Sequence, residues 1–398
     1  MSSAYTLNFS EIGMGDAPRV GAKNASLGEL FVALKPKGVG ALDGFAITTD
    51  AYWRLLDEQN LRGKLEDVFS NLNPQNLDEV AAAGYGARTQ ILQAPLPDDL
   101  GRSILDAYHD LVARLKHEPE MAVRSSASAV DLPEGSIASA AETYLNVRGQ
   151  GALLRAVHQC FASLFTDRAI SDRARQGYPQ LKIALSVGVM PMVSSDLACS
   201  GLIHTLDAEP GFCDIVRVSA SYGLGEFLAQ GGVTPDEWLV FKPSLRKGPE
   251  AIVGRRLGSK EIRLTYDVET RCTRSEATPP EDRARFCLED SDVHQLAEWA
   301  CLIEEHFSAL AKRDQPIDIE WAKDGITCGL FILQAGIRAA HADRESVEFC
   351  GRTPSDFPEF PEWLVAHGID SKSLNPDASV KTTLRLAAVK PHSFASAR

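Results

Sequence analysis

Hydrophobic residues follow two kinds of spacing along this chain. Helical spacing, in which apolar side chains recur every three or four residues, predicts amphipathic helices over 24–34, 49–70, 77–93, 98–116, 150–176 and 291–311. In 98–116, for instance, Leu100, Ile104 and Leu111 fall on one face. Short apolar runs predict strands over 121–124, 183–193, 201–206, 214–220, 238–242 and 252–257. The polar, proline-bearing stretch 271–285 predicts a surface loop. Together these patterns indicate a mixed α/β fold.

Two further runs, 317–321 and 330–335, predict a hairpin around the dipeptide Asp324-Gly325. In the first run, acidic and apolar residues alternate, so the acids share one face of the strand. If the loop centres near Thr327, Gln334 lies opposite Glu320. A carboxylate and an amide oxygen on adjacent strands suit Mg²⁺, which prefers hard oxygen ligands and keeps several waters. The alternative is that Glu320 is simply solvated.

Composition and charge narrow the class of protein. The 398 residues are 44% hydrophobic, enough for a packed core, which excludes a disordered or fibrous chain. Acidic residues outnumber basic ones by 54 to 41, giving a formal charge of −13 that argues against nucleic-acid binding. No signal-like N-terminus and no apolar stretch of roughly 18 residues occur. The eight cysteines are scattered without metal spacing. We therefore expect a cytoplasmic protein with no membrane or nucleic-acid partner.

Two short motifs could hold a phosphate group. A glycine turn at Gly21 leads through Lys23 into a predicted helix, so backbone N–H groups and one cation lie together, although the Walker A pattern is absent. Arg124 ends a predicted strand and precedes two serines, so its guanidinium could grip an anion approached closely by small side chains. A solvated lysine and an ordinary surface arginine are the alternatives. The loop 131–143 could close over a nucleotide.

Taken in order, these blocks resemble the ATP-binding front part of the phosphoenolpyruvate synthase (pyruvate, water dikinase) family. The resemblance runs from about residue 12 to residue 335 and includes RVGAKNASLGEL (19–30), AVRSSASAVDLPEGS (122–136), SYGLGEFLAQGGVTPDEW (221–238) and IDIEWAKDG (317–325). It implies an ATP-grasp fold with one lobe over 1–200 and a second lobe over 201–340. The tail, 341–398, resembles the end of the family's pyruvate-binding barrel, with Cys350 at the position of its catalytic cysteine.

The resemblance also implies roles for individual residues. Lys23 and Arg124 match the residues that hold the ATP phosphates, and both are catalytic candidates. Glu320 and Gln334 match the pair beside the metal and the phosphates. Three more positions match the nucleotide cleft: Met192 and Val193 at the adenine, and Glu226 on a nearby motif.

The sequence departs from the family pattern at several places. Gly336 stands where the family has an arginine that contacts the transferring phosphate, and Arg338, two residues on, is the candidate to replace it. The loop 136–143 lacks the usual glycine and glutamines, and Met190-Pro191 replaces a more polar pair. No TCHAA-type phosphohistidine motif occurs in these residues.

The leading hypothesis is therefore an ATP-dependent phosphotransferase that binds Mg²⁺ and ATP. It would pass phosphate to a histidine on a separate phosphohistidine-domain protein, as in split phenylphosphate and cresol-phosphate synthases, with pyruvate or a phenol as the final small-molecule acceptor. The alternatives are a catalytically weakened nucleotide-binding regulator and a direct kinase of a small molecule.

Overall fold

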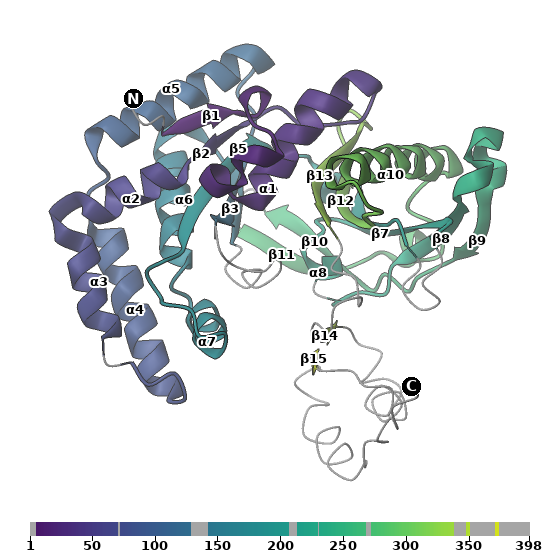
Figure 1. Cartoon of the computed structure of the whole chain (residues 1–398). Coiled ribbons are helices and arrows are strands. Elements are labelled where there is room, and N and C mark those ends of the chain that lie inside the picture. Colours follow the sequence, from purple (N-terminus) through teal and green to yellow (C-terminus); the bar gives the residue numbers. More distant parts are fainter. Residues whose placement is uncertain are drawn as a thin grey trace, which may run out of the picture. The chain divides into compact units, whose positions relative to one another are not determined.

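A computed structural model describes residues 5–70, 72–128, 142–206, 213–229, 231–267, 272–337, 348–350 and 371–373. The chain divides into two compact units (Figure 1). The first unit comprises Met1–Ser194, Leu302–Lys312 and Ile317–Ile337. The second comprises Ser195–Cys301, Arg313–Pro316 and Arg338–Arg398. The functional lobes expected from the sequence, 1–200 and 201–340, stay predictions.

A five-stranded antiparallel sheet forms the centre of the first unit. Its order is β1-β2-β5-β3-β4, with bounds β1 (Thr6–Asn8), β2 (Phe45–Ile47), β3 (Met121–Ser128), β4 (Thr143–Val147) and β5 (Ala184–Pro191). The strands predicted over 121–124 and 183–193 are confirmed as β3 and β5. Most side chains of β5 are buried, as its nearly continuous apolar run predicts.

Helices of the first unit form one large apolar core with this sheet. They are α2 (Thr49–Asp57), α3 (Leu61–Phe69), α4 (Leu77–Gln93), α5 (Asp98–Leu115), α6 (Gly149–Ser163) and α7 (Asp167–Arg175). Helix α1 (Ala17–Glu29) precedes them in the chain. The predicted face of α5 is confirmed, because Leu100, Ile104 and Leu111 are fully buried. The stretch predicted to be helical over 150–176 forms two helices, α6 and α7. Thr166 is extended, and its hydroxyl caps α7 by accepting the Ala169 N–H, so α6 ends first.

Helix α1 contains a sharp kink at Gly21, whose φ of 73° lies in the left-handed region. A Cβ at this position would lie 2.2 Å from Ser126 Oγ and 2.7 Å from the Ser126 carbonyl oxygen. Only glycine therefore lets α1 approach β3 so closely. The regular helix resumes after the kink, where the sequence predicts its start, and continues as a π-helical turn over Leu30–Leu34.

The predicted hairpin in the first unit is confirmed as β12 (Ile317–Lys323) and β13 (Leu330–Ile337). Glu320 pairs with Gln334, as the sequence predicts, whereas Trp321 pairs with Ile332. Leu333 is thus an extra residue in β13, a β-bulge that the alternation of apolar residues does not reveal. Ile319 and Trp321 are buried, and Glu320 lies on the more accessible face.

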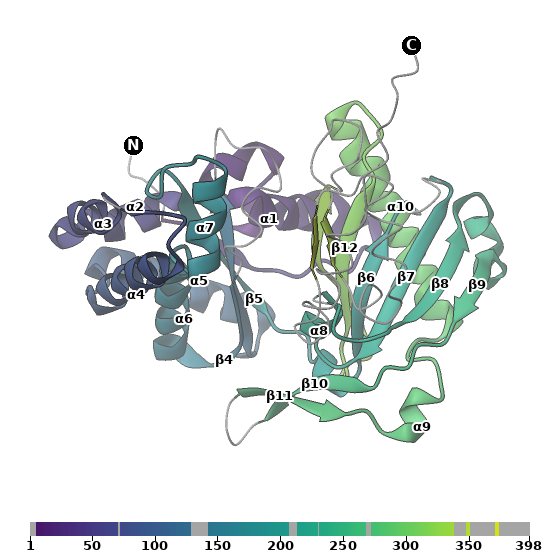
Figure 2. The same cartoon turned by 90° about the horizontal axis from the view of Figure 1, so that it is seen from below.

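In the second unit, four antiparallel strands lie in sequence order (Figure 2). They are β6 (Cys199–His204), β7 (Ile215–Tyr222), β8 (Asp236–Phe241) and β9 (Ile252–Arg256). A separate hairpin consists of β10 (Ile262–Asp267) and β11 (Cys272–Ala277). Two short helices are α8 (Glu226–Ala229) and α9 (Pro280–Arg283), and the long helix α10 (Asp290–Ala311) begins in this unit and ends in the first.

The surface loop predicted over 271–285 is wrong, because this stretch contains β11 and α9. Its strand carries charged and hydroxyl side chains in place of apolar ones, so it lacks the alternation that identifies a half-buried strand. Cross-strand ion pairs substitute for apolar contacts: Arg263 and Glu276 lie directly opposite each other, with Nη2 2.8 Å from Oε1.

A fully buried ion pair organises the second unit. Lys260 Nζ lies 2.5 Å from Asp236 Oδ1, and neither side chain is exposed. Asp236 also accepts the backbone N–H groups of Gly258 and Cys287, while Lys260 donates to the carbonyl of Gly258. Such a pair persists in a core only when additional hydrogen bonds satisfy both charges, as they do here.

The described part of the tail is small. Strand β14 (Glu348–Cys350) pairs in parallel with β15 (Ser371–Ser373). The remaining residues of 338–398, including Arg338, lie outside the described residues, so the resemblance of the tail to a barrel end stays a prediction. Among the helices that the structure describes, none has the length and apolar character needed to cross a membrane.

Replacing Gly21 by alanine tests the close approach of α1 to β3. We expect Gly21→Ala to lower the free energy of unfolding by about 1–3 kcal/mol more than Gly177→Ala, because only the first Cβ overlaps a strand. Gly177 is a matched control: its φ is also 73°, and a Cβ there would meet nothing within 4 Å. Denaturant unfolding measures both variants, and equal losses would contradict the proposed overlap.

Candidate functional site

Three charged side chains from distant parts of the sequence meet in the first unit. Lys23 comes from α1, Arg124 from β3 and Glu320 from β12. Arg124 Nη1 lies 3.5 Å from Glu320 Oε2. Burial lowers the pKa of Lys23; the Glu320 carboxylate opposes this shift, and the Arg124 charge adds to it. The three groups, here called the charge cluster, therefore interact electrostatically and hold two cations against one anion.

Small side chains of α1 fix this helix, and with it Lys23, against its neighbours. Ser26 Oγ donates to the carbonyl oxygen of Ala335 in β13 at 2.6 Å. Asn24 Nδ2 donates to Ser186 Oγ in β5 at 3.0 Å. Both α1 side chains are buried, so these contacts, together with the Gly21 kink, set the depth at which Lys23 enters the cluster.

The β-bulge at Leu333 positions Arg124. Because Leu333 is the extra residue of β13, its carbonyl lies outside the regular ladder, and it accepts a hydrogen bond from Arg124 Nη1 at 3.2 Å. The guanidinium is mostly buried, with 19% of the side chain exposed. Its Nε is buried and has no hydrogen-bond partner within the described residues. Arg124 thus retains a donor in a place where an unpaired donor is costly.

Glu320 and Gln334 lie on adjacent strands next to Arg124 and supply oxygen ligands of the hard type. The Glu320 side chain is 38% exposed, so its carboxylate is accessible to solvent. Across the described residues, no group of three or more histidine, cysteine or acidic side chains could hold a metal ion. The pair therefore does not form a closed protein cage, but it fits an ion such as Mg²⁺ that takes most of its ligands from water and a bound anion.

The segment predicted to face adenine follows β5 in the same unit. Met192 donates its backbone N–H to the carbonyl oxygen of Glu120 at 2.8 Å, and Met192 Sδ accepts the Asn146 N–H at 3.3 Å. Val193 is buried, with 6% exposed. These contacts fix the segment beside the sheet. Its assignment to adenine stays a prediction.

Of the other predicted positions, Gly336 and Glu226 lie within the described residues. Gly336 pairs with Asp318 in the hairpin, and a Cβ at Gly336 would meet no atom within 4 Å, so a larger side chain has room. Glu226 is the first residue of α8 in the second unit. Arg338 and most of the loop 136–143 lie outside the described residues.

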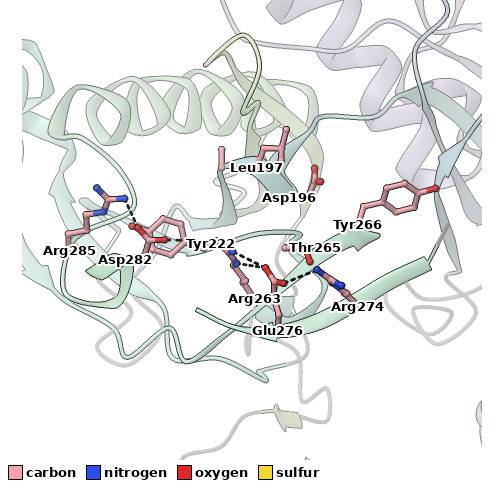
Figure 3. A pocket seen from close by; sticks show the side chains of 11 residues that line it. Asp196, Leu197, Tyr222, Arg263, Thr265, Tyr266, Arg274, Glu276, Asp282 and Arg285 are labelled. Atoms are coloured by element: carbon pink, nitrogen blue, oxygen red, sulfur yellow. Dashed lines mark hydrogen bonds and ion pairs between the residues drawn. The ribbon is translucent and has the colours of Figure 1, made fainter. Parts of the chain in front are cut away.

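The second unit contains a polar cavity of about 420 Å³ that sequence reasoning missed (Figure 3). Its arginines are already paired: Arg263 and Arg274 share the carboxylate of Glu276, and Arg285 binds Asp282. The lining therefore offers no excess positive charge to an anion. Burial raises the pKa of Tyr222 to about 12. The lining residues are Asp196, Leu197, Ala198, Tyr222, Arg263, Thr265, Tyr266, Arg274, Glu276, Asp282 and Arg285.

Known proteins are similar in sequence to this chain over most of the first unit and much of the second. Residues 17–349 match the family model described as pyruvate phosphate dikinase, AMP/ATP-binding domain. Phosphoenolpyruvate synthase of Aquifex aeolicus is 45% identical over 345 residues, which cover 86% of this chain and 40% of the relative. The Escherichia coli phosphoenolpyruvate synthase is 43% identical over 337 residues, covering 84% and 42% respectively. The chain thus spans about two fifths of the length of these relatives.

Replacing Glu320 by glutamine tests whether the cluster is electrostatically coupled. Because the Glu320 carboxylate raises the pKa of Lys23 against the effect of burial, we expect Glu320→Gln to lower that pKa further. An NMR titration of the Lys23 side chain, assigned with Lys23→Arg, measures the change. Glu276→Gln in the second unit is the control and should leave the pKa unchanged. A Lys23 pKa that stays constant in Glu320→Gln would exclude the coupling.

Proposed function

This chain belongs to the family of the pyruvate phosphate dikinase AMP/ATP-binding domain, and we propose that it binds Mg-ATP and passes a phosphoryl group to a histidine on a separate partner. The resemblance seen in the sequence blocks is confirmed by the family match. The observation that carries the proposal is the charge cluster, in which two cations face a single carboxylate. Such an excess of positive charge attracts the polyphosphate of a nucleotide.

In the proposed site, each residue has a distinct role. Lys23 and Arg124 hold the phosphates through their cationic groups. Glu320 and Gln334 would hold Mg²⁺, which when bound neutralises charge on the phosphate oxygens. Met192 and Val193 contact adenine. Phosphoryl transfer needs such positioning and charge neutralisation more than it needs covalent chemistry from the protein.

The partner and the final acceptor are part of the proposal. The similarity to two phosphoenolpyruvate synthases favours a dikinase-type reaction, and we propose AMP and phosphate as its products. The 398 residues contain no TCHAA-type motif, so in this proposal the carrier histidine lies outside them, on a phosphohistidine domain. Pyruvate or a phenol would then be the final acceptor, and Glu226 and Arg338 would complete the site.

A second candidate is a nucleotide-binding regulator with weakened catalysis. It is favoured by Gly336, which places no side chain where the family has an arginine. A direct kinase of a small molecule is the third candidate. The three candidate functions predict different results. The phosphotransferase turns over ATP only with a histidine partner, the regulator binds the nucleotide without turnover, and the direct kinase turns over ATP without any partner protein.

Incubation with ATP labelled at the β- and γ-phosphates, with and without a phosphohistidine-domain partner, tests the proposal. We expect AMP and labelled partner only when both proteins are present. Lys23→Ala and Arg124→Ala should each weaken Mg-ATP binding at least tenfold, because each removes a charge-assisted contact of about 1.5–3 kcal/mol. Arg255→Ala, which removes an ion pair with Asp290 in the second unit, is the control. Binding without turnover favours the regulator, and unchanged affinity in both cluster variants rejects the site.

Restoring the family's arginine tests the effect of Gly336. We expect Gly336→Arg to raise the rate of AMP formation by up to about 10²–10³, while the affinity for ATP changes little, because the new donor meets charge that grows in the transition state. The position has room for the side chain. Steady-state kinetics with the partner measure both quantities. A flat rate in Gly336→Arg together with loss of activity in Arg338→Ala would show that Arg338 has taken over the role.

A further inference from the structure

Asp324 occupies the turn of the β12–β13 hairpin and is almost buried, with 9% exposed. Its Oδ1 accepts three hydrogen bonds from inside the turn: from the N–H of Ile326 at 3.0 Å, and from the N–H and the hydroxyl of Thr327 at 2.7 and 3.0 Å. Its backbone N–H donates to the carbonyl of Gly329 at 2.8 Å. Oδ1 alone therefore accounts for the cap of the turn.

The second carboxylate oxygen, Oδ2, connects the turn to a distant segment of the chain. Asp324 Oδ2 accepts the backbone N–H of Ser194 at 2.9 Å, from a segment 130 residues earlier in the chain. The neighbouring Gly325 N–H donates to the Ser194 carbonyl at 3.0 Å, so Ser194 is held at both of its backbone groups. All of these residues lie in the first unit. The hairpin turn is thus tied to the segment that directly follows Met192 and Val193.

The hydrogen bond between Asp324 and Ser194 depends on an ionised Asp324 carboxylate. Burial alone would raise the pKa of Asp324, but hydrogen bonds from Thr327, Ser194 and Ile326 lower it below its ordinary value of 3.8. A group whose folded pKa is lowered contributes its stability above the ordinary pKa and loses it as the pH falls through the lowered value. At neutral pH the link is therefore a charge-assisted hydrogen bond, the stronger kind.

We infer that Asp324 is a positioning residue that sets the spacing between the adenine segment and the Glu320–Gln334 pair. Glu320 lies four residues before Asp324 on β12, and Val193 lies one residue before Ser194. The adenine and the phosphates of one nucleotide can then contact these two segments at the same time. This inference rests on the proposed function, in which one of the two linked segments binds the adenine of ATP and the other binds its phosphates.

Register matters because ATP is a bivalent ligand for such a site. When both half-sites are held at the correct spacing, binding of one end gives the other end a high effective concentration. A loosened tie leaves each half-site intact but reduces this gain. Loss of Asp324 should therefore weaken the whole nucleotide more than either of its fragments. A general loss of stability would weaken the nucleotide and both fragments alike.

The test compares Asp324→Asn with the wild-type chain. In this variant an amide NH₂ group replaces one carboxylate oxygen and cannot accept a hydrogen bond from a backbone N–H. One set of hydrogen bonds is therefore lost, while the volume of the side chain stays nearly constant. Calorimetry and NMR titration at pH 7 with Mg²⁺ measure the dissociation constants of ATP, adenosine and tripolyphosphate. We expect ATP to bind roughly tenfold more weakly, as expected for one charge-assisted hydrogen bond. Adenosine and tripolyphosphate should stay within about threefold. Exchange of the Ser194 amide hydrogen should become faster.

Thr327→Val is the matched control, because it removes the hydrogen bonds of this hydroxyl to Asp324 and from the Gly329 N–H and leaves the Ser194 link in place. It should keep the ATP affinity within about threefold. If Asp324→Asn does not fold, Asp324→Ser is used, since its short hydroxyl can cap the turn but cannot reach Ser194.

Two results overturn the inference alone: unchanged ATP affinity in the Asp324 variant, or an equal loss for ATP and both fragments. A wild-type chain that binds no ATP overturns the proposed function instead, and the inference falls with it. The wild-type measurement therefore separates the two failures.

Discussion

The placement of two cations beside one carboxylate is the constraint on which the first unit depends. Burial of Lys23 disfavours its charge, Glu320 offsets part of that cost, and Arg124 increases it again. No arrangement of these three groups alone removes the excess positive charge. An anion of high charge density would do so. The cluster is thus an incomplete electrostatic arrangement, and the polyphosphate of ATP completes it in the proposed function.

The backbone brings this cluster together at positions where it departs from regular structure. Gly21 adopts a left-handed conformation so that α1 can lie against β3, and Leu333 forms a bulge whose carbonyl receives Arg124. Asp324 holds the turn between the two strands. Each departure would be a defect in an ordinary helix or hairpin. Here the kink and the bulge direct a side chain and a carbonyl toward the charge cluster, as bulges and tight turns commonly do near functional sites.

How far the sequence predicts this arrangement depends on the range of the interactions. The apolar face of α5 and the pairing of Glu320 with Gln334 follow from local periodicity and an Asp-Gly turn, so both were predictable. The break at Thr166 and the strand β11 were missed, because a capping hydroxyl and cross-strand ion pairs leave no apolar periodicity. The bulge at Leu333 and the link from Asp324 to Ser194 are set by tertiary contacts. No local pattern encodes them.

Lys260, which is fully buried, and Lys23, which is half-buried, show how a structural charge differs from one proposed to bind a ligand. Lys260 is wholly buried and pairs one to one with Asp236, and backbone groups satisfy the rest of both side chains. The polar cavity in the same unit is also balanced, since its guanidiniums are neutralised by their own carboxylates. Lys23, in contrast, shares a single carboxylate with Arg124. Burial by itself therefore does not identify a site in this protein. The informative feature is a partly buried charge that its neighbours leave unbalanced, and this feature favours the charge cluster of the first unit as the proposed binding site.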